Sequence, residues 1–201
     1  MPISPSPNPV LLVHGITDTG KVFTKMANQL RLAGFSTHDL DLIPNNGDEP
    51  LEVLAKQVQE YCQRSFSHQQ KFDIVAFSMG GIVSRYYLQR LGGLDLVERF
   101  ITISSPHQGT ILAYASNKPG CVQMRPNSAF LRDLNSDIDQ LKKLDFTSIW
   151  TPYDLMILPP RSSKMPFGRE IIIPAFTHPW MLTDNRCIQA IINVLKQTRI
   201  D

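Results

Sequence analysis

Two patterns of apolar residues alternate along the chain. Short, nearly continuous apolar runs, typical of buried strands, cover residues 10–13, 36–43, 72–77, 100–103, 146–150 and 170–173. Segments with apolar residues three and four positions apart predict helices at 22–33, 51–65, 81–91 and 185–196. This alternation predicts an α/β fold with a doubly wound, mostly parallel sheet and helices on both faces. Ligands of such sheets bind beyond the carboxyl ends of the strands.

A serine directly follows the strand predicted at 72–77, within the stretch AFSMGG that runs from Ala76 to Gly81. On a strand-to-helix turn the hydroxyl of Ser78 would stand clear of the sheet, which is the arrangement of a nucleophile elbow. Because so tight a turn brings neighbouring chain close, the positions two before and two after the serine need small residues, and Ala76 and Gly80 meet that need. The usual motif has glycine in place of Ala76, so the assignment depends on the strand–turn–helix context.

A serine hydroxyl becomes a good nucleophile when a base accepts its proton and a third group orients that base. In folds with this elbow, an acid and then a histidine follow the serine along the chain. His178 is the only histidine beyond the last predicted strand, and it lies in the loop before the last predicted helix. Asp154 lies four residues beyond the strand at 146–150. We therefore expect Ser78, Asp154 and His178 to form a catalytic triad.

Other acids remain as alternatives to Asp154. Asp184 lies close to His178 in the chain and opens the last predicted helix, so helix capping is its expected role. Three acids far beyond the strand at 100–103 could serve as a displaced acid: Asp133, Asp137 and Asp139.

Acyl transfer from an ester also needs two backbone donors for the oxyanion of the tetrahedral intermediate. One donor is expected directly after the nucleophile, at the amide of Met79, and the other in the loop after the first core strand, at the amide of Ile16. His14 precedes the nucleophile in the chain, so we expect it to have a structural role beneath the site.

Composition narrows the classes of function. The chain of 201 residues suits one domain, with a proline-rich tail at 1–9 and a segment at 110–143 that could shape a pocket. A charged fraction of 19% and a net charge of +2 provide no large basic field, so a small substrate is expected and nucleic acid is not. The three cysteines, Cys62, Cys121 and Cys187, are widely spaced with no CxxC pair, which predicts free thiols and no zinc or redox site.

The start of the chain, with four prolines in nine residues and no apolar core, predicts no secretory signal, so a cytoplasmic location is expected. The chain contains nothing near 18 uninterrupted apolar residues, which excludes a transmembrane helix and leaves transient contact with a membrane surface open. The oligomeric state is not predicted.

Several blocks together resemble the α/β-hydrolase superfamily and, within it, the small bacterial lipases of the class 2 type, some of which carry alanine in the elbow. The blocks are VLLVHG at 10–15, DIVAFSMGG at 73–81, IVSRYYLQRLGG at 82–93, TISSPHQGT at 102–110, TSIWTPYD at 147–154 and the loop of His178. The resemblance implies a minimal α/β-hydrolase fold and ester hydrolysis through an acyl-serine intermediate with no cofactor. It also implies a structural role for His107 beside the site.

The expected function is therefore that of a serine hydrolase acting on carboxylic esters, with a lipid or another acyl ester as substrate. A small-ester carboxylesterase and an acyltransferase would use the same residues and remain alternatives. A binding protein that retains the fold without turnover is the alternative from another class.

Overall fold

The strand before the serine lies in the middle of a six-stranded sheet. This computed structural model describes residues 7–197. The strands are β1 (Val10–Val13), β2 (Thr37–Leu40), β3 (Phe72–Phe77), β4 (Val97–Ile103), β5 (Asp145–Trp150) and β6 (Arg169–Ile172). They lie in the order β2-β1-β3-β4-β5-β6, and every neighbouring pair is parallel. The predicted α/β fold with a parallel sheet is confirmed, and all carboxyl ends meet at one edge.

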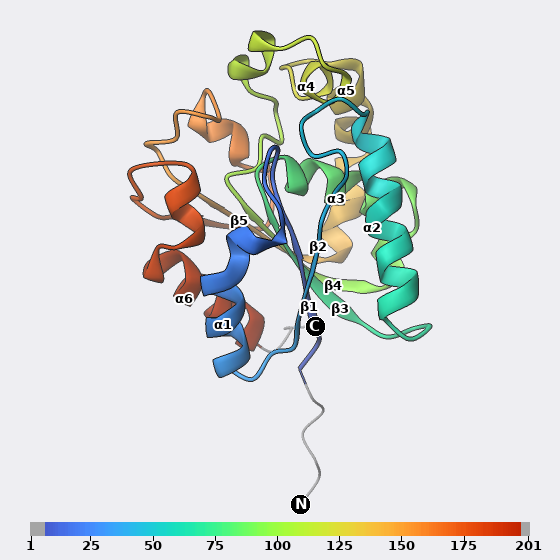
Figure 1. The fold of residues 1–201 in the computed structure, drawn as a ribbon, viewed down its shortest axis with the longest axis vertical. Helices are drawn as coiled ribbons and strands as arrows, with labels where there is room; N and C mark the ends of the chain where they lie inside the picture. Colours follow the sequence, from blue (N-terminus) through green and yellow to red (C-terminus); the bar gives the residue numbers. More distant parts are fainter. Residues whose placement is uncertain (1–6, 198–201) are drawn as a thin grey trace, which may run out of the picture.

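Helices cover both faces of this sheet, as predicted (Figure 1). The α-helices are α1 (Thr24–Leu32), α2 (Leu51–Ser65), α3 (Met79–Arg90), α4 (Pro119–Gln123), α5 (Ala129–Ser136) and α6 (Asn185–Lys196). The short 3-10 helices are η1 (Gly20–Phe23), η2 (Gly93–Asp95), η3 (Ile111–Ala115), η4 (Ile138–Lys143), η5 (Pro160–Ser163) and η6 (Pro179–Leu182). One core lies between the sheet and α2 and α3, and a second between the sheet and α1 and α6.

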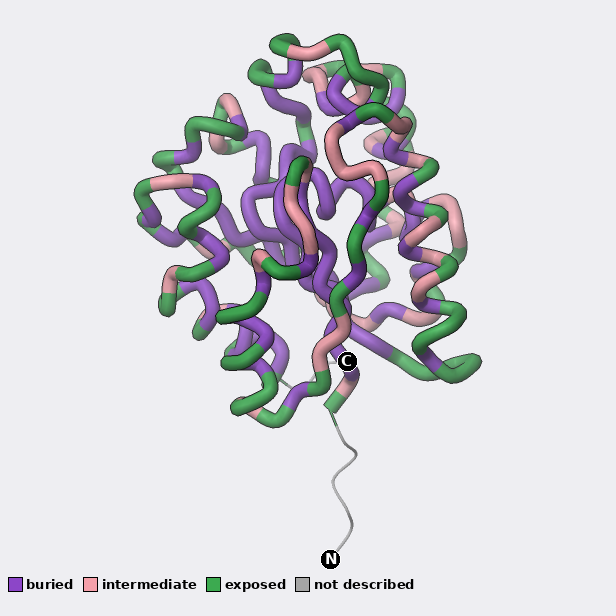
Figure 2. The backbone as a smooth tube through the Cα atoms, in the orientation of Figure 1, coloured by how far each residue is buried: buried purple, intermediate pink, exposed green. Residues whose placement is uncertain are grey.

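Burial follows this layering. In Figure 2 the tube through the central strands is purple, whereas green segments lie mainly on the outer helices and loops. All residues of β1 and β3 are buried, as expected for parallel strands covered on both faces. The three cysteines are buried free thiols, as the sequence predicts. Within residues 7–197, no helix is long and apolar enough to cross a membrane.

Several element boundaries differ from the sequence prediction. The strand expected at 100–103 begins three residues earlier, as β4, and the strands expected at 146–150 and 170–173 each begin one residue earlier, as β5 and β6. The strand expected at 36–43 is the shorter β2, because its only neighbour is the four-residue β1 and their pairing ends at Val13 and Leu40. The helix expected at 22–33 starts with the 3-10 turn η1. The helix expected at 81–91 starts earlier, at Met79, because the two glycines lie inside its first turn. Of the tail expected at 1–9, residues 1–6 lie outside the described residues.

Candidate active site

Ser78 lies on a sharp turn between β3 and α3. Its backbone has φ 53° and ψ −125°, a conformation that costs a non-glycine residue energy and occurs mostly at functional sites. The Ser78 amide donates to Ile103 O at 2.9 Å, which fixes the turn to β4. A Cβ atom on Gly80 would lie 2.4 Å from Val13 O, so only glycine allows α3 to pass this close to β1. The strained serine and the glycine requirement are the two local features of a nucleophile elbow.

His178 and Asp154 are brought together from two loops at the carboxyl edge of the sheet. Asp154 follows β5, His178 follows β6, and Nδ1 of His178 lies 2.7 Å from Oδ2 of Asp154. The other carboxylate oxygen, Oδ1, accepts hydrogen bonds from the amides of Met156 and Ile157, both at 2.9 Å. Both side chains are buried, and the imidazole packs against the ring of Phe77 with 4.6 Å between centroids.

The hydrogen bonds to Asp154 favour its ionised form. Burial by itself would raise the pKa of this carboxyl, but the hydrogen bond and charge of His178 and the two loop amides lower the pKa below its ordinary value. A carboxylate at Oδ2 accepts from Nδ1–H of His178, which leaves Nε2 as the ring atom available for proton transfer.

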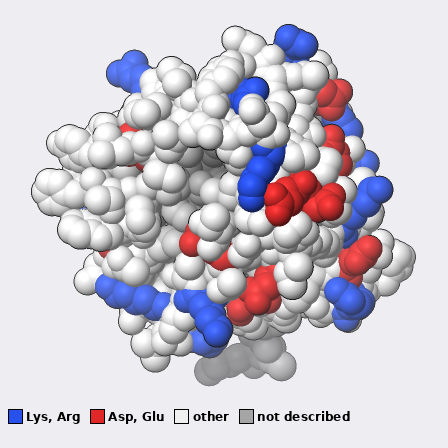
Figure 3. Space-filling model, turned by 45° about the horizontal axis from the view of Figure 1, so that its top comes forward, with Lys and Arg blue, Asp and Glu red and all other residues white. Residues whose placement is uncertain are grey.

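Ser78 and His178 line one cavity of about 180 Å³, which we call the His178 cavity. Ile16, Thr17, Asp18, Phe77, Met156 and Pro179 complete its lining. Ser78, Ile16 and Met156 also line a second cavity of about 140 Å³, the Thr110 cavity, with Pro106, Thr110, Leu112, Ala113, Cys121, Met124 and Ile157. Figure 3, in which the top of Figure 1 is turned forward, shows a hollow on this side surrounded mainly by uncharged side chains.

The two predicted oxyanion donors lie at the same place. Met79 is the first residue of α3, where helix amides have no intrahelical acceptor and the helix dipole favours negative charge. Ile16 lines both cavities beside Ser78. The next amide along, that of Thr17, donates to Asn45 O at 2.7 Å and is therefore occupied. The geometry therefore favours the amide of Ile16 over that of Thr17 as the second oxyanion donor. The oxyanion role of Ile16 and Met79 stays a prediction.

His14 and His107 have structural partners. His14 is fully buried, its Nδ1 lies 2.8 Å from Gly15 O, and its Nε2 accepts from the amide of Leu42 at 2.8 Å. His107 is also fully buried, with Nε2 3.1 Å from Thr102 Oγ1, and burial together with the charge of Arg85 lowers its pKa well below the ordinary value. A neutral, enclosed imidazole suits a structural role.

The alternative acids lie in other interactions. The Asp184 side chain accepts from the amide of Arg186 at the start of α6, so the predicted cap is present. Asp133 and Asp137 form ion pairs with Arg90, and Asp139 pairs with Lys142. Only Asp154, of these acids, is hydrogen-bonded to His178.

The segment at 110–143 forms a wall of the Thr110 cavity, and part of it belongs to the core. Leu112, Ala113, Cys121 and Met124 line the cavity. Phe130 and Leu131, from the same segment, are buried in the core beside α3. Ile111 and Tyr114 are each 59% exposed and do not line the cavity.

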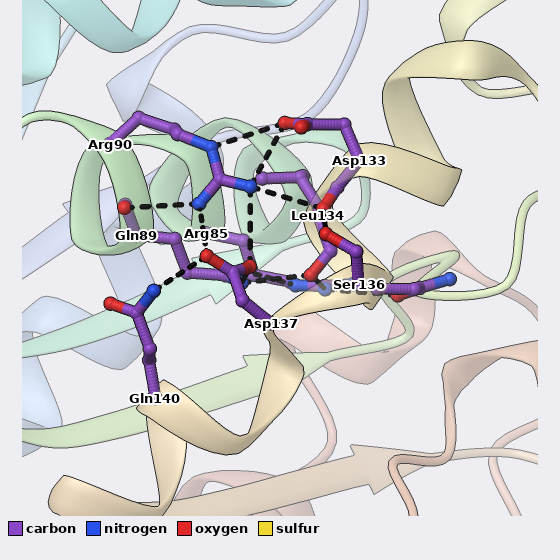
Figure 4. Close-up of polar contacts among 9 residues, drawn as sticks. Arg85, Gln89, Arg90, Asp133, Leu134, Ser136, Asp137 and Gln140 are labelled. Atoms are coloured by element: carbon purple, nitrogen blue, oxygen red, sulfur yellow. Dashed lines mark hydrogen bonds and ion pairs between the residues drawn. The ribbon is translucent and has the colours of Figure 1, made fainter.

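A polar network joins the later part of the segment at 110–143 to α3, the helix that follows Ser78 (Figure 4). The guanidinium of Arg85, fully buried on α3, donates to Leu134 O at 2.8 Å and to Asn135 Oδ1 at 3.0 Å. Arg90 forms ion pairs with Asp133 and Asp137 at 3.0 and 2.6 Å. The helix α5 is thus attached to α3 at several points, as expected for a fixed wall.

The carboxylate of Asp18 is a site residue that the sequence reasoning missed. It lies in the His178 cavity, three residues after Gly15 in the loop that follows β1. Burial raises its pKa, and the nearby His14 and His178 oppose that rise. The sequence did contain a signal for Asp18. It is a polar residue in the loop at the carboxyl end of a central strand, and such loops surround the ligand site of this fold.

A larger cavity, of about 400 Å³, lies at the other end of the sheet between the ends of α2 and α3. Its lining includes Cys62 and Tyr87. Burial raises the pKa of the Cys62 thiol to about 12 and also raises that of the Tyr87 hydroxyl, so neither is a nucleophile at neutral pH. Among residues 7–197 no group of three or more His, Cys, Asp and Glu side chains is arranged to hold a metal ion.

Comparison with known proteins places the chain in a family. The model of the family described as palmitoyl protein thioesterase matches residues 9–149. The chain belongs to the palmitoyl protein thioesterase family. The matched range includes the Ser78 elbow and ends before Asp154 and His178, so it does not bear on the last two positions.

Solved structures similar to this family member share its fold. The mature Bacillus licheniformis lipase BlEst2 superposes with a TM-score of 0.77 at 19% identity, over 96% of this chain and 93% of that one. A Listeria innocua gene product gives 0.75 at 16% identity, over 97% and 96% of the chains. Aspergillus fumigatus lipase B gives 0.81 at 17% identity, over 95% of this chain but 53% of the lipase.

The predicted resemblance to the α/β-hydrolases is thereby confirmed, and the fold is that of the lipase and esterase type. Family and fold together make the chain an ester-cleaving hydrolase in general terms.

Proposed function

We propose that residues 1–201 form a single-domain serine hydrolase that cleaves carboxylic esters of lipids through an acyl-serine intermediate. The observation that carries the proposal is the 2.7 Å contact between His178 Nδ1 and Asp154 Oδ2, in a site where His178 and the strained Ser78 share one cavity. A nucleophile, a base and an orienting acid from three separate strand ends are the minimum for this chemistry.

In the proposed acylation step, Oγ of Ser78 attacks the acyl carbonyl while Nε2 of His178 accepts the hydroxyl proton. Asp154 holds the ring in the Nδ1–H tautomer and stabilises the imidazolium that forms. The amides of Met79 and Ile16 donate to the oxyanion, where each such donor typically contributes about 10²- to 10³-fold in rate. The imidazolium then gives its proton to the departing alcohol, which leaves an ester on Ser78.

Deacylation repeats this sequence with water. His178 takes a proton from the water as its oxygen attacks the acyl carbonyl, and the second tetrahedral intermediate collapses to release the acid and regenerate Ser78. Every proton in the cycle moves between His178, Ser78, the leaving alcohol and water, so the proposal requires no cofactor.

A lipid substrate is supported by the apolar lining of the Thr110 cavity and by apolar side chains around the site. Thr110 binds loop backbone through its hydroxyl, and most of the other lining residues are apolar. Exposed apolar side chains on the loops at the carboxyl edge include Ile111, Tyr114, Leu155, Phe176 and Trp180. Such side chains suit transient contact with an assembled lipid surface.

A thioester substrate is the second candidate, favoured by the family match to palmitoyl protein thioesterases. An acyl-serine mechanism serves esters and thioesters alike, because both place a carbonyl beside a leaving group that departs after or without protonation. Release of palmitate from an S-palmitoyl peptide, compared with release from a triacylglycerol, separates the two substrates.

The direct test is Ser78→Ala, with turnover of chromogenic esters from acetyl to long-chain acyl as the readout. We expect a loss of at least about 10³-fold with the fold intact. Ser65→Ala is the matched control, because Ser65 is exposed at the end of α2. Wild-type rates in the Ser78 variant would refute the proposal.

The same series separates the related activities. A lipase prefers the longer acyl chains, a small-ester carboxylesterase prefers the shorter ones, and an acyltransferase forms new ester when glycerol is added.

A further inference from the structure

Two cavities of different chemistry meet at Ser78. The Thr110 cavity presents mainly aliphatic and thioether side chains, with Leu112, Ala113 and Met124 among them. The His178 cavity contains the imidazole of His178 and the carboxylate of Asp18. A substrate attacked at Ser78 extends from its carbonyl in two directions. One cavity offers it an almost wholly apolar lining, and the other adds an imidazole and a carboxylate to apolar side chains.

The chemistry decides which part of the ester lies in which cavity. The leaving oxygen has to receive a proton from His178, so it must lie on the side of the imidazole. That side is the His178 cavity, which Asp18 also lines. The acyl chain then extends the other way, into the Thr110 cavity. Asp18 therefore lies beside the leaving group.

Asp18 is held in position without using its carboxylate. Asn45 donates through its side chain to Asp18 O and accepts at its own carbonyl from the amide of Thr17. An ideal Cβ on Gly15 would lie 3.1 Å from Asp18 Oδ2 and 3.0 Å from Ser78 Cβ, so the carboxylate lies over Gly15 on the same side as the nucleophile. Among residues 7–197, no amide or side chain donates a hydrogen bond to either carboxylate oxygen of Asp18.

The Asp18 carboxylate is partly buried, and burial is the main cause of the raised pKa of Asp18. A hydroxyl group of a bound ligand would donate a hydrogen bond to this carboxylate, whereas a phosphate group would add repulsion between like charges.

We propose that Asp18 is the receptor for the leaving group and selects esters of polyhydroxylated alcohols over esters whose alcohol carries phosphate. This inference rests on the proposed function, because it takes Ser78 as the nucleophile and His178 as the proton donor. It adds a substrate class: neutral glycerol-type acyl esters, with hydroxyl groups within reach of the Asp18 carboxylate.

The test compares kcat/KM for three octanoyl esters that differ only in the alcohol: 1-octanoylglycerol, propyl octanoate and 1-octanoylglycerol 3-phosphate. Octanoate release is measured by mass spectrometry for the wild-type chain, Asp18→Ala and Asp18→Asn. Asp95→Asn is the charge-matched control, since Asp95 is exposed in η2 before β4, at the opposite edge of the sheet.

We expect the wild-type preference for the glycerol ester over the propyl ester to fall by about 10- to 100-fold in Asp18→Ala, as for loss of a hydrogen bond to a charged group. Asp18→Asn should raise the rate on the phosphate ester relative to the propyl ester, because the repulsive charge is gone. Asp95→Asn should change neither ratio.

Ratios within twofold of wild type in both Asp18 variants would overturn the inference, as would a loss of the same size on all three esters. Failure of the proposed function would give a different result from failure of the Asp18 inference, because the Ser78→Ala variant would then still release octanoate. An inactive Ser78 variant with unchanged Asp18 ratios overturns the leaving-group assignment alone.

Discussion

His178 Nδ1 and Asp154 Oδ2 lie 2.7 Å apart, although 24 positions separate the two residues in the chain. The parallel sheet makes this possible, because β5 and β6 are neighbours and their carboxyl ends release both loops at one edge. The amides of Met156 and Ile157 hold the second carboxylate oxygen, so the acid is fixed before a substrate binds. In the proposed mechanism this arrangement sets the tautomer of the base.

Asp154→Asn should therefore lower kcat by about 10³- to 10⁴-fold, because an amide no longer stabilises the imidazolium or fixes Nδ1–H. Steady-state kinetics on a chromogenic ester measure this, with circular dichroism to show that the fold is kept. Asp139→Asn is the control, since Asp139 is exposed and pairs with Lys142. Equal losses in both variants would contradict the assignment of Asp154.

Filling the Thr110 cavity should shorten the preferred acyl chain. Ala113 lines this cavity of about 140 Å³ and is buried, so Ala113→Leu places extra carbons where the proposed acyl chain lies. We expect kcat/KM to fall about tenfold or more for decanoyl and longer esters, and much less for acetyl esters. The control Ala129→Leu changes an exposed residue at the start of α5. An unchanged chain-length profile in Ala113→Leu would place the acyl chain elsewhere.

The two arginines of α3 should differ in their contribution to stability. Arg85 is fully buried, and Arg85→Met leaves Leu134 O and Asn135 Oδ1 without this donor, so we expect a loss of about 2–4 kcal/mol in the free energy of unfolding. The Arg90 ion pairs are partly exposed, so Arg90→Met should cost less than about 1 kcal/mol. Urea unfolding measures both, and the reverse order would show that the buried contacts matter less than the ion pairs.

The buried Asp73 should make stability fall as the pH rises from about 4 to about 6. Burial raises the pKa of this carboxyl to about 6 although Arg99 opposes the rise, so in this range the folded chain binds more protons than the unfolded chain. The free energy of unfolding should drop by up to about 3 kcal/mol from this group. Asp73→Asn removes that titration, so the difference in stability between the two proteins should vary across pH 4–6. A constant difference would be inconsistent with the raised pKa.

The regular elements could be predicted where the local pattern and the tertiary contacts agree. The expected ranges for β1, α2, β3 and α6 match the structure residue for residue, because the two strands have clear apolar runs and the two helices have clear helical spacing. The end of β2 could not be predicted, because the length of its partner strand limits it. The start of α3 was missed because Gly80 and Gly81, which usually weaken helices, are required there by close contacts with β1 and Ser105.

The three candidate triad residues could be predicted from the sequence, but the residues that line the two cavities around them could not. Chain order together with position after a predicted strand selects Ser78, Asp154 and His178, and the structure brings the last two into contact. The role of Asp18 could not be assigned from sequence, because it depends on the position of the carboxylate over Gly15 and beside Ser78. The same holds for the segment at 110–143, where the structure alone distinguishes the residues that line the Thr110 cavity from those buried in the core.

The most direct test of the serine mechanism is the mass of the intact chain after reaction with a fluorophosphonate ester, followed by peptide mapping. We predict a single covalent adduct on Ser78, absent in Ser78→Ala and formed much more slowly in His178→Ala. A wild-type chain that remains unmodified, or an adduct on another residue with Ser78 free, would contradict the account.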